Sequence, residues 1–517
     1  MRFALIILLL CFGTSVSSQH NLISTHPFFR DKLFETSRSE SYNGNSFLPV
    51  TESNYNLQKH LIDTSIFYYD FTETVYKKHW VELKTEDCYI TISPVFDFAL
   101  GRESEDTPGR NLFQNSRGFI IEGDIAKNFS FATTFYENQA RLSKYESAFV
   151  SSHGEFYFKN NGTGYSMQNG VVPGATRTKE FKGDGFDYGF AQGYIVYQPH
   201  KKLDLIFGNN QQFIGAGYRS MLLSDNSAGA PYFRLDYRIS KRWSYTVLRT
   251  RAMNLVRKKK KTTVEAYYQP KGYSVNYLSF QASDKLSISL FEGATWSMGD
   301  SLNTKRVNAL FYNPIPVVSS LLNDSICSGI QGINVNWLLH PNARFYGQFA
   351  LGSFGDKQYA FQIGYRGNNY FNIKNLYSQL EYNFATARMY KASSDRLNYS
   401  NYNLALAHPK ENGFHELVLR LGWEWKRIYA DFKSVNYFLI DHEKNNLLPI
   451  PYFASIPVSN DKISHNQLEL GYRINKKLNW CFFGNVIYRK QTGAENTNAF
   501  IVTAGMRTAL LSHYNDY

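Results

Sequence analysis

The densest group of charged side chains in this 517-residue sequence is the run RKKKK, which comprises Arg257, Lys258, Lys259, Lys260 and Lys261. Five adjacent cations can bind the phosphate or uronate groups of an anionic glycan. They can also be solvated, or lie near lipid headgroups, and these alternatives stay open. The net charge of +13 likewise favours an anionic contact such as lipopolysaccharide or acidic polysaccharide. We therefore take this run as a candidate anionic-glycan site.

A second candidate is the glycine-rich stretch from Gly208 to Pro231. Its glycines let the backbone approach other groups closely or adopt positive φ, yet it also contains apolar residues that are unusual in a solvated loop. A loop that folds into the protein interior and constricts it explains both features. The glycine spacing is not that of a nucleotide-binding loop. The candidate constriction residues are Gly208, Gly215, Gly217, Tyr218 and Arg219.

A third set of charges alternates with apolar residues and is therefore expected to share one face of several strands. These charges could form a selectivity lining or a ligand path, or they could be paired ions that fill a non-conducting interior. Their mixed signs favour paired ions, because a tuned channel usually has one dominant sign at its constriction. The candidate lining residues are Arg234, Asp236, Arg238, Arg420, Glu424 and Arg473.

Enzymatic motifs are missing from the sequence. It contains no GxSxG, HExxH, GxxxxGK[ST] or CxxC pattern. Cys88, Cys327 and Cys481 are too few and too widely spaced for a disulfide framework or a zinc site. Carboxylate pairs of the glycosidase kind stay open, since they arise by chance among 43 acidic residues. We expect a non-enzymatic protein with no cofactor and no metal.

The N-terminus predicts export. Arg2 precedes an apolar run, and Val16 and Ser18 have the small side chains of a cleavage site, so residues 1–18 are predicted to be a signal peptide. No later stretch is apolar enough for a transmembrane helix, but a closed barrel can span a membrane because closure pairs every backbone amide. An aromatic content of 16% at a mean hydropathy of −0.39 fits a barrel with aromatic girdles. Nucleic acid is not an expected partner of an exported chain.

Alternation with a period of two residues supports the barrel. Between Phe414 and Trp425, for example, Leu417 and Leu421 share one face while Glu416 shares the other with two further charges. Short polar turns, such as Ala126–Asn128 and Lys426–Arg427, alternate with mostly longer connections. This asymmetry is typical of short periplasmic turns and long extracellular loops. We therefore predict an all-β, antiparallel outer-membrane β-barrel of about 18 strands over residues 89–517, with both ends on the periplasmic side.

Residues 19–88 show no clear ladder of strands. Phe71 to Leu83 is predicted to be an amphipathic helix with Tyr76 and Trp80 on its apolar stripe. We expect this N-terminal segment to be a periplasmic cap or plug, or else a loosely ordered leader.

Four stretches resemble the gliding-motility protein RemB family of the Bacteroidota. They are GNNQQFIGAGYRSMLLSDNSAGAPYFRLDYRI, VYKKHWVELKTEDCYITISPVFDFALGRE, FYNPIPVV and MRTALLSHYNDY. The resemblance implies a cell-surface component of gliding motility in a setting that includes the type IX secretion system. In architecture the family is similar to Wzi-like outer-membrane proteins of capsule assembly, which are thought to hold capsular polysaccharide as lectins. It supplies no catalytic residues.

Three hypotheses follow. The leading one is a non-enzymatic surface protein of gliding or adhesion, and the alternatives are a Wzi-like polysaccharide binder and an outer-membrane channel. The expected partners are outer-membrane lipid and lipopolysaccharide, with gliding or type IX secretion components and surface polysaccharide as further candidates. The ligand, the conductance of the lumen and the oligomeric state stay open.

Overall fold

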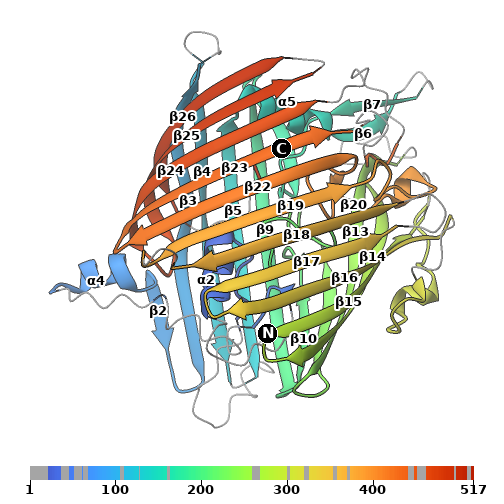
Figure 1. Ribbon diagram of the computed structural model, residues 1–517, viewed down its shortest axis with the longest axis horizontal. Helices are drawn as coiled ribbons and strands as arrows, with labels where there is room; N and C mark the ends of the chain where they lie inside the picture. Colours follow the sequence, from blue (N-terminus) through green and yellow to red (C-terminus); the bar gives the residue numbers. More distant parts are fainter. Residues whose placement is uncertain are drawn as a thin grey trace, which may run out of the picture.

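Eighteen antiparallel strands pair in a ring that closes where the last strand meets the first (Figure 1). The computed structural model describes residues 21–36, 46–51, 61, 68–104, 110–126, 128–159, 164–258, 268–299, 303–319, 325–352, 358–369, 373–440, 447–450, 461–493, 496–508 and 514–517. The signal peptide predicted over residues 1–18 lies outside these described residues.

The wall strands follow the order of the sequence around the ring, so each pairs with its predecessor and its successor. They are β3 (Cys88–Glu103), β4 (Leu112–Ile125), β5 (Phe129–Arg141), β9 (Gly185–His200), β10 (Leu203–Gly208), β12 (Tyr232–Arg238), β13 (Trp243–Arg257), β14 (Tyr268–Ser283), β15 (Leu286–Ser297), β16 (Cys327–His340), β17 (Ala343–Leu351), β18 (Tyr359–Asn368), β19 (Leu376–Ala385), β22 (Phe414–Trp425), β23 (Ile428–Leu439), β24 (Lys462–Asn475), β25 (Trp480–Thr492) and β26 (Thr497–Arg507).

The predicted alternation is confirmed in β22. Leu417, Leu421 and Trp423 are exposed on the outer face, whereas Glu416 is completely buried inside. Apolar side chains are exposed in the same way around the whole wall, as on a surface that faces lipid. The barrel is therefore an outer-membrane barrel.

The connections confirm the predicted short–long rhythm. Residues 126–128, 201–202, 284–285, 341–342 and 426–427 are short turns at one end of the barrel, while residues 209–231, 298–326 and 386–413 are long connections at the other. By this asymmetry the short turns mark the periplasmic end. β3 begins at that end and β26 runs towards it, as predicted.

Few other elements are present. The helices are α2 (Pro27–Thr36), α4 (Asp70–Lys77), α5 (Lys144–Ser152), η2 (Ala309–Tyr312) and η5 (Asp395–Leu397). The remaining strands are β1 (Phe47–Leu48), β2 (Val81–Lys84), β6 (Glu155–Phe158), β7 (Tyr165–Gln168), β8 (Arg177–Phe181), β11 (Phe213–Ile214), β20 (Ser400–Asn401) and β21 (Leu404–Ala405). Among the described residues, no helix is long and apolar enough to cross a membrane.

The helix predicted over Phe71 to Leu83 is only partly correct. Helix α4 ends at Lys77, and Val81–Lys84 pairs with β3 as strand β2, because the edge of β3 offers this segment unpaired backbone groups. No residue of α4 is buried. The helix therefore lies outside the barrel.

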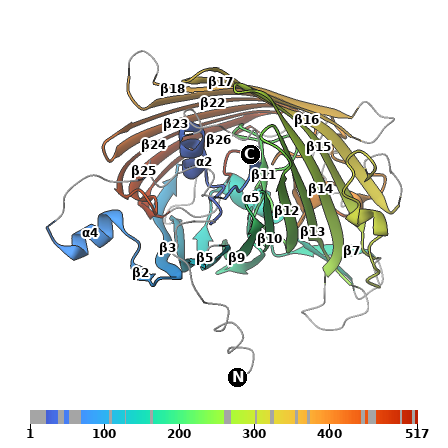
Figure 2. The ribbon, with the colours of Figure 1, turned by 90° about the horizontal axis from the view of Figure 1, so that it is seen from below.

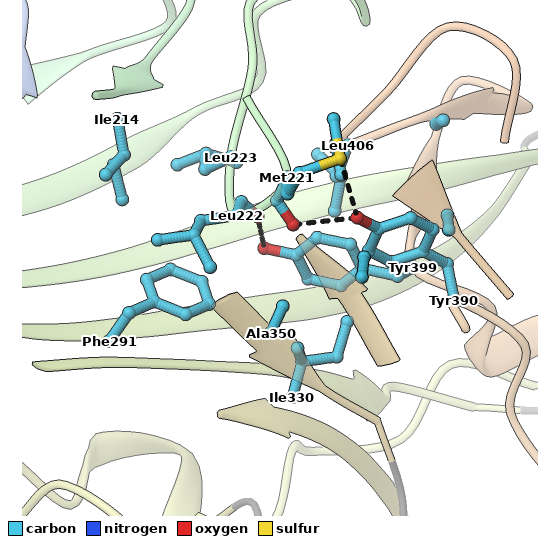
Figure 3. Packing of buried hydrophobic residues seen from close by; sticks show 14 of the residues in the cluster. Ile214, Met221, Leu222, Leu223, Phe291, Ile330, Ala350, Tyr390, Tyr399 and Leu406 are labelled. Atoms are coloured by element: carbon cyan, nitrogen blue, oxygen red, sulfur yellow. Dashed lines mark hydrogen bonds between the residues drawn. The ribbon is translucent and has the colours of Figure 1, made fainter. Parts of the chain in front are cut away.

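Helix α2, in contrast, lies inside the ring of strands (Figure 2). The main apolar cluster is also internal and is formed by segments that are distant in sequence (Figure 3). Tyr390 donates a hydrogen bond to the carbonyl of Met221, and Tyr399 donates one to the carbonyl of Leu222. The lumen of this barrel is thus filled by packed loops.

Candidate functional site

The connection between β10 and β12, residues 209–231, folds into the barrel. Every residue from Gln211 to Ala230 is buried. Gly215 has φ +116°, a conformation that side chains rarely allow. A Cβ on Gly217 would lie 2.6 Å from the carbonyl oxygen of Arg219. The predicted folded-in loop is therefore present, and two of its glycines are required by the backbone.

The tip of this loop is held by Glu381 of β19. The backbone amides of Tyr218 and Arg219 donate to its carboxylate over 2.7 and 3.1 Å, and Tyr346 donates over 2.8 Å. Glu381 is completely buried, so these donors replace the water that an ionised carboxylate needs. This cradle fixes the position of the loop in the lumen.

Arg219 is the centre of the contacts at the tip. Its Nε donates to Glu416 of β22 over 3.0 Å, and its Nη2 donates to Tyr437 of β23 over 2.8 Å and to Asp516 over 2.7 Å. Nε2 of His408 lies 2.7 Å from a carboxylate oxygen of Glu416, and burial lowers the pKa of His408. We call Arg219, Glu381, Glu416, Tyr437 and Asp516 the upper cluster.

The C-terminal residues 514–517 enter the same cluster. Asp516 also forms an ion pair of 2.9 Å with Lys433. Although burial would raise it, Arg219 and Lys433 hold the pKa of Asp516 well below its ordinary value. The ring of Tyr517 stacks on Phe149 of α5 with centroids 3.8 Å apart. The tail therefore connects the plug to an extracellular loop.

The N-terminal segment fills the lumen below the loop tip. Asp31 of α2 forms ion pairs of 2.8 Å with Arg366 and 2.9 Å with Arg420. Although burial would raise it, Arg420 and Arg366 lower the pKa of Asp31 to about 2. Strand β1 pairs with β11 of the folded-in loop. Helix α2, strand β1, the folded-in loop and residues 514–517 thus form one plug.

The other candidate lining residues also face inward and have partners. Arg234 donates over 2.9 Å to the carbonyl of Pro49 and pairs with Asp236 over 2.7 Å. Arg473 pairs with Glu424 over 3.0 Å. Arg238 lies 3.7 Å from Asp204. Paired ions of mixed sign therefore occupy the lumen.

The RKKKK run is divided in the structure. Arg257 is buried at the end of β13, where its guanidinium pairs with Glu155 over 2.9 Å. Lys258 donates to the hydroxyl of Thr304. Lys259, Lys260 and Lys261 lie outside the described residues. Arg257 thus serves a local contact between two loops, which the charge pattern did not predict.

A cavity of about 460 Å³ remains between α2 and the wall formed by β22–β26 and β3–β9. At one end it is lined by Asn375, Glu424 and Asn479, which lie at the periplasmic turns. At the other end it reaches Tyr218 and Asn515 of the plug, and Leu142 and Glu146 at the start of α5 on the extracellular side. The cavity therefore runs along the inside of this wall, beside the plug.

Sequence reasoning missed Asp31 and Asp516. Both lie in segments without strand periodicity, and each has an arginine partner, Arg366 or Arg219, that is more than 290 residues away. The sequence did contain an indication for Asp516. It lies between the aromatic residues Tyr514 and Tyr517, and aromatic side chains next to a charge are typical of a segment that packs against the protein. Chemically, the site holds its charges in buried ion pairs. No cluster of metal-ligating residues occurs among the described residues.

Comparisons with known proteins support the fold. No protein-family model matches the sequence, and no curated protein matches it. The outer-membrane protein Wzi of Escherichia coli, described as a carbohydrate-binding β-barrel involved in group 1 capsule assembly, is similar in structure with a TM-score of 0.52 and 11% identity. The match covers 95% of this chain and 100% of Wzi.

OccAB4 of Acinetobacter baumannii matches with a TM-score of 0.43 and 10% identity, over 82% of this chain and 98% of that one. OprD of Pseudomonas aeruginosa matches with a TM-score of 0.43 and 10% identity, and the match covers 81% of this chain and 96% of OprD. The match to Wzi, together with the closed ring of strands, gives the chain a Wzi-like outer-membrane barrel architecture. The resemblance to RemB stays a prediction, which none of these comparisons supports.

Proposed function

We propose that this chain is a non-enzymatic and non-conducting outer-membrane protein that binds polysaccharide at the cell surface and serves adhesion or gliding. The observation that carries the proposal is the plug. Arg219, Glu416 and Asp516 meet inside the lumen with side chains that are 0% exposed. A solute would have to separate these ion pairs inside a low-dielectric interior, which is costly. A protein that does not conduct solute through its lumen can still bind a ligand at the extracellular end of the barrel, and this is the function we propose.

The polysaccharide part of the proposal has two supports. Wzi, which shares the barrel architecture, is a carbohydrate-binding β-barrel. In addition, β13 ends on the extracellular side, and the sequence continues after it with Lys258 to Lys261, four adjacent cations that suit acidic glycans. The gliding or adhesion setting comes from the resemblance to RemB.

Planar-bilayer recording tests the plug. Purified full-length protein is expected to insert without a steady open-state current in 1 M salt. A variant that lacks residues 514–517 is the comparison, since it loses Asp516 and should show at least transient openings. A steady open-state current from the intact protein would favour the channel hypothesis instead.

Glycan binding is tested with two matched variants. One replaces Lys258, Lys259, Lys260 and Lys261 with Ala. The control replaces Lys201, Lys202, Lys241 and Arg242, four exposed cations of the periplasmic turns, with Ala. Only the first is expected to weaken the binding of an alginate oligosaccharide, by about tenfold or more. If both variants and the unchanged protein bind the alginate oligosaccharide equally well, Lys258 to Lys261 do not bind the glycan.

The gliding role is tested in cells. Deleting the gene is expected to reduce spreading on agar and single-cell movement on glass. Normal movement in both assays would separate this chain from gliding and leave adhesion and polysaccharide binding.

A further inference from the structure

We propose that the cavity between α2 and the barrel wall is a second ligand site, which takes a neutral oligosaccharide. It shares no residue with the run Lys258 to Lys261 used by the proposed function, so either site can fail without the other. Its volume of about 460 Å³ lies within the range of small-molecule sites. We define the cavity by Asp97, Asp431, Asn485 and Thr503 on one wall and by Tyr188 on the other.

The polar wall is a continuous row. Asp431 of β23 is paired with Glu469 of β24, Glu469 with Asn485 of β25, and Asn485 with Thr503 of β26. Neighbouring strands are about 4.8 Å apart, so four strands place these groups along about 14 Å. Because partners in register share a face, all four project into the lumen. The row is long enough to contact more than one sugar ring.

Several acceptors in this wall have no protein partner. The Oδ1 of Asn485 has no hydrogen-bond partner among the described residues, although only 8% of Asn485 is exposed. The same holds for one carboxylate oxygen of Asp97. Asp431 is exposed to the cavity and forms no ion pair with any residue of the described ranges. Buried polar atoms normally have partners, so the acceptors of Asn485 and Asp97 favour a ligand that donates hydrogen bonds, and the exposed carboxylate of Asp431 is a further acceptor beside them.

The charges of the cavity favour a neutral ligand. The lining residues include six carboxylates and five cationic side chains. Glu469 already pairs with Arg507 over 2.5 Å, and Glu424 with Arg473 over 3.0 Å. An anion would meet the unpaired carboxylates of Asp97 and Asp431, whereas a cation would meet several guanidinium groups. The hydroxyl groups of a neutral sugar can donate hydrogen bonds to the carboxylates and accept hydrogen bonds from the guanidinium groups.

The other wall is aromatic. Phe190 stacks on Tyr136 with centroids 4.7 Å apart, and Tyr188 packs edge-on against Phe190 at 5.8 Å. All three line the cavity. A pyranose has C–H groups on its faces and hydroxyls at its edges, so it needs an aromatic surface opposite a row of polar acceptors. The cavity offers both.

Titration calorimetry on the detergent-solubilised full chain tests the proposal. The probes are three neutral hexasaccharides (maltohexaose, laminarihexaose and chitohexaose), an alginate hexasaccharide and hexalysine. At least one neutral probe is expected to bind. Asp431→Asn and Asn485→Ala should each weaken that binding about tenfold, the effect of losing one or two good hydrogen bonds. Asn466→Ala is the matched control, because Asn466 lies on the outer side of the same strand as Glu469.

A second type of variant keeps the test valid if Asn485→Ala does not fold. In Thr503→Trp the large side chain occupies the cavity and should abolish binding, while the other three polar residues of the row stay in place. Binding of a neutral probe that survives all three cavity variants would overturn the proposal. So would binding of no neutral probe, or tighter binding of hexalysine that Asp431→Asn removes, which would mark a site for a cationic peptide.

Discussion

The upper cluster and the cavity below it lie on the same strands but differ in how their inward-facing groups are satisfied. Near the extracellular end, Glu381, Glu416 and Tyr437 are buried and are contacted by Arg219 or its backbone. Nearer the periplasm, Asp431 has no ion pair among the described residues, and Asn485 has an acceptor without a partner. The strands supply similar side chains to both regions.

The difference comes from the segments that enter the lumen. A buried carboxylate is stable only where cations or donors replace water. The folded-in loop and the C-terminal tail bring these groups to the upper cluster, whereas none of the described segments supplies an ion pair to Asp431 or a donor to the Oδ1 of Asn485. The upper cluster is therefore a closure, and the cavity is a place where a ligand can supply the missing partners.

The largest effect is expected from Arg219→Ala. Removing this side chain leaves Glu416 and Asp516 buried with less compensation, which costs about 3–5 kcal/mol of unfolding free energy. Urea titration of the protein in lipid vesicles, followed by tryptophan fluorescence, measures it. Arg251→Ala is the control, since Arg251 is exposed. Asp431→Asn should change stability by less than about 0.5 kcal/mol. An equal loss at Arg219 and Asp431 would contradict the distinction between the regions.

A second, smaller effect is expected from Gly217→Ala. The added Cβ would lie 2.7 Å from a carboxylate oxygen of Glu381 and 2.8 Å from the amide of Gln362. Such overpacking costs about 1–3 kcal/mol. Gly484→Ala in β25 is the matched control, because a Cβ there meets no atom within 4 Å. The same urea titration measures this loss. An unchanged free energy of unfolding in Gly217→Ala would show that the loop tip is not tightly packed.

The sequence was sufficient for the wall and for part of the plug. Alternation in segments such as Phe414–Trp425 and the lengths of the turns predicted the barrel, because the lipid face and the lumen face impose a period of two. The glycines and apolar residues of the 208–231 loop predicted that it folds inward, because solvated loops need neither.

The ion pairs inside the lumen could not be predicted from local sequence patterns. Asp31 and Arg420 are 389 residues apart, and Arg219 and Asp516 are 297 apart, so only closure of the barrel brings them together. Arg257 shows the opposite error. Its place in a basic run predicted a surface role, but burial beside Glu155 gives it a local ion pair.

A third effect is expected at the boundary between the two regions. Asp31→Asn removes the charge that pairs with Arg366 and Arg420, and the loss should be about 1–2 kcal/mol, since the Asp31 side chain is 20% exposed. The N-terminal segment should then become more accessible to a protease added on the periplasmic side. Asp284→Asn in a periplasmic turn is the control. Unchanged digestion would mean that the contacts of β1, not Asp31, hold the segment.

The smallest effect is expected from pH. The folded-state pKa of Asp31 is lowered from 3.8 to about 2, so its contribution is fully present above pH of about 4 and is lost as the pH falls towards 2. Protease digestion of the N-terminal segment should therefore be constant between pH 8 and 5. The pKa of Asp516 also lies well below its ordinary value, so acid should free the tail only at a pH well below 5. Hydrogen exchange after acid pulses would measure the release of both segments. Release of either segment at pH 5 would contradict a plug whose two ends are held by these carboxylates.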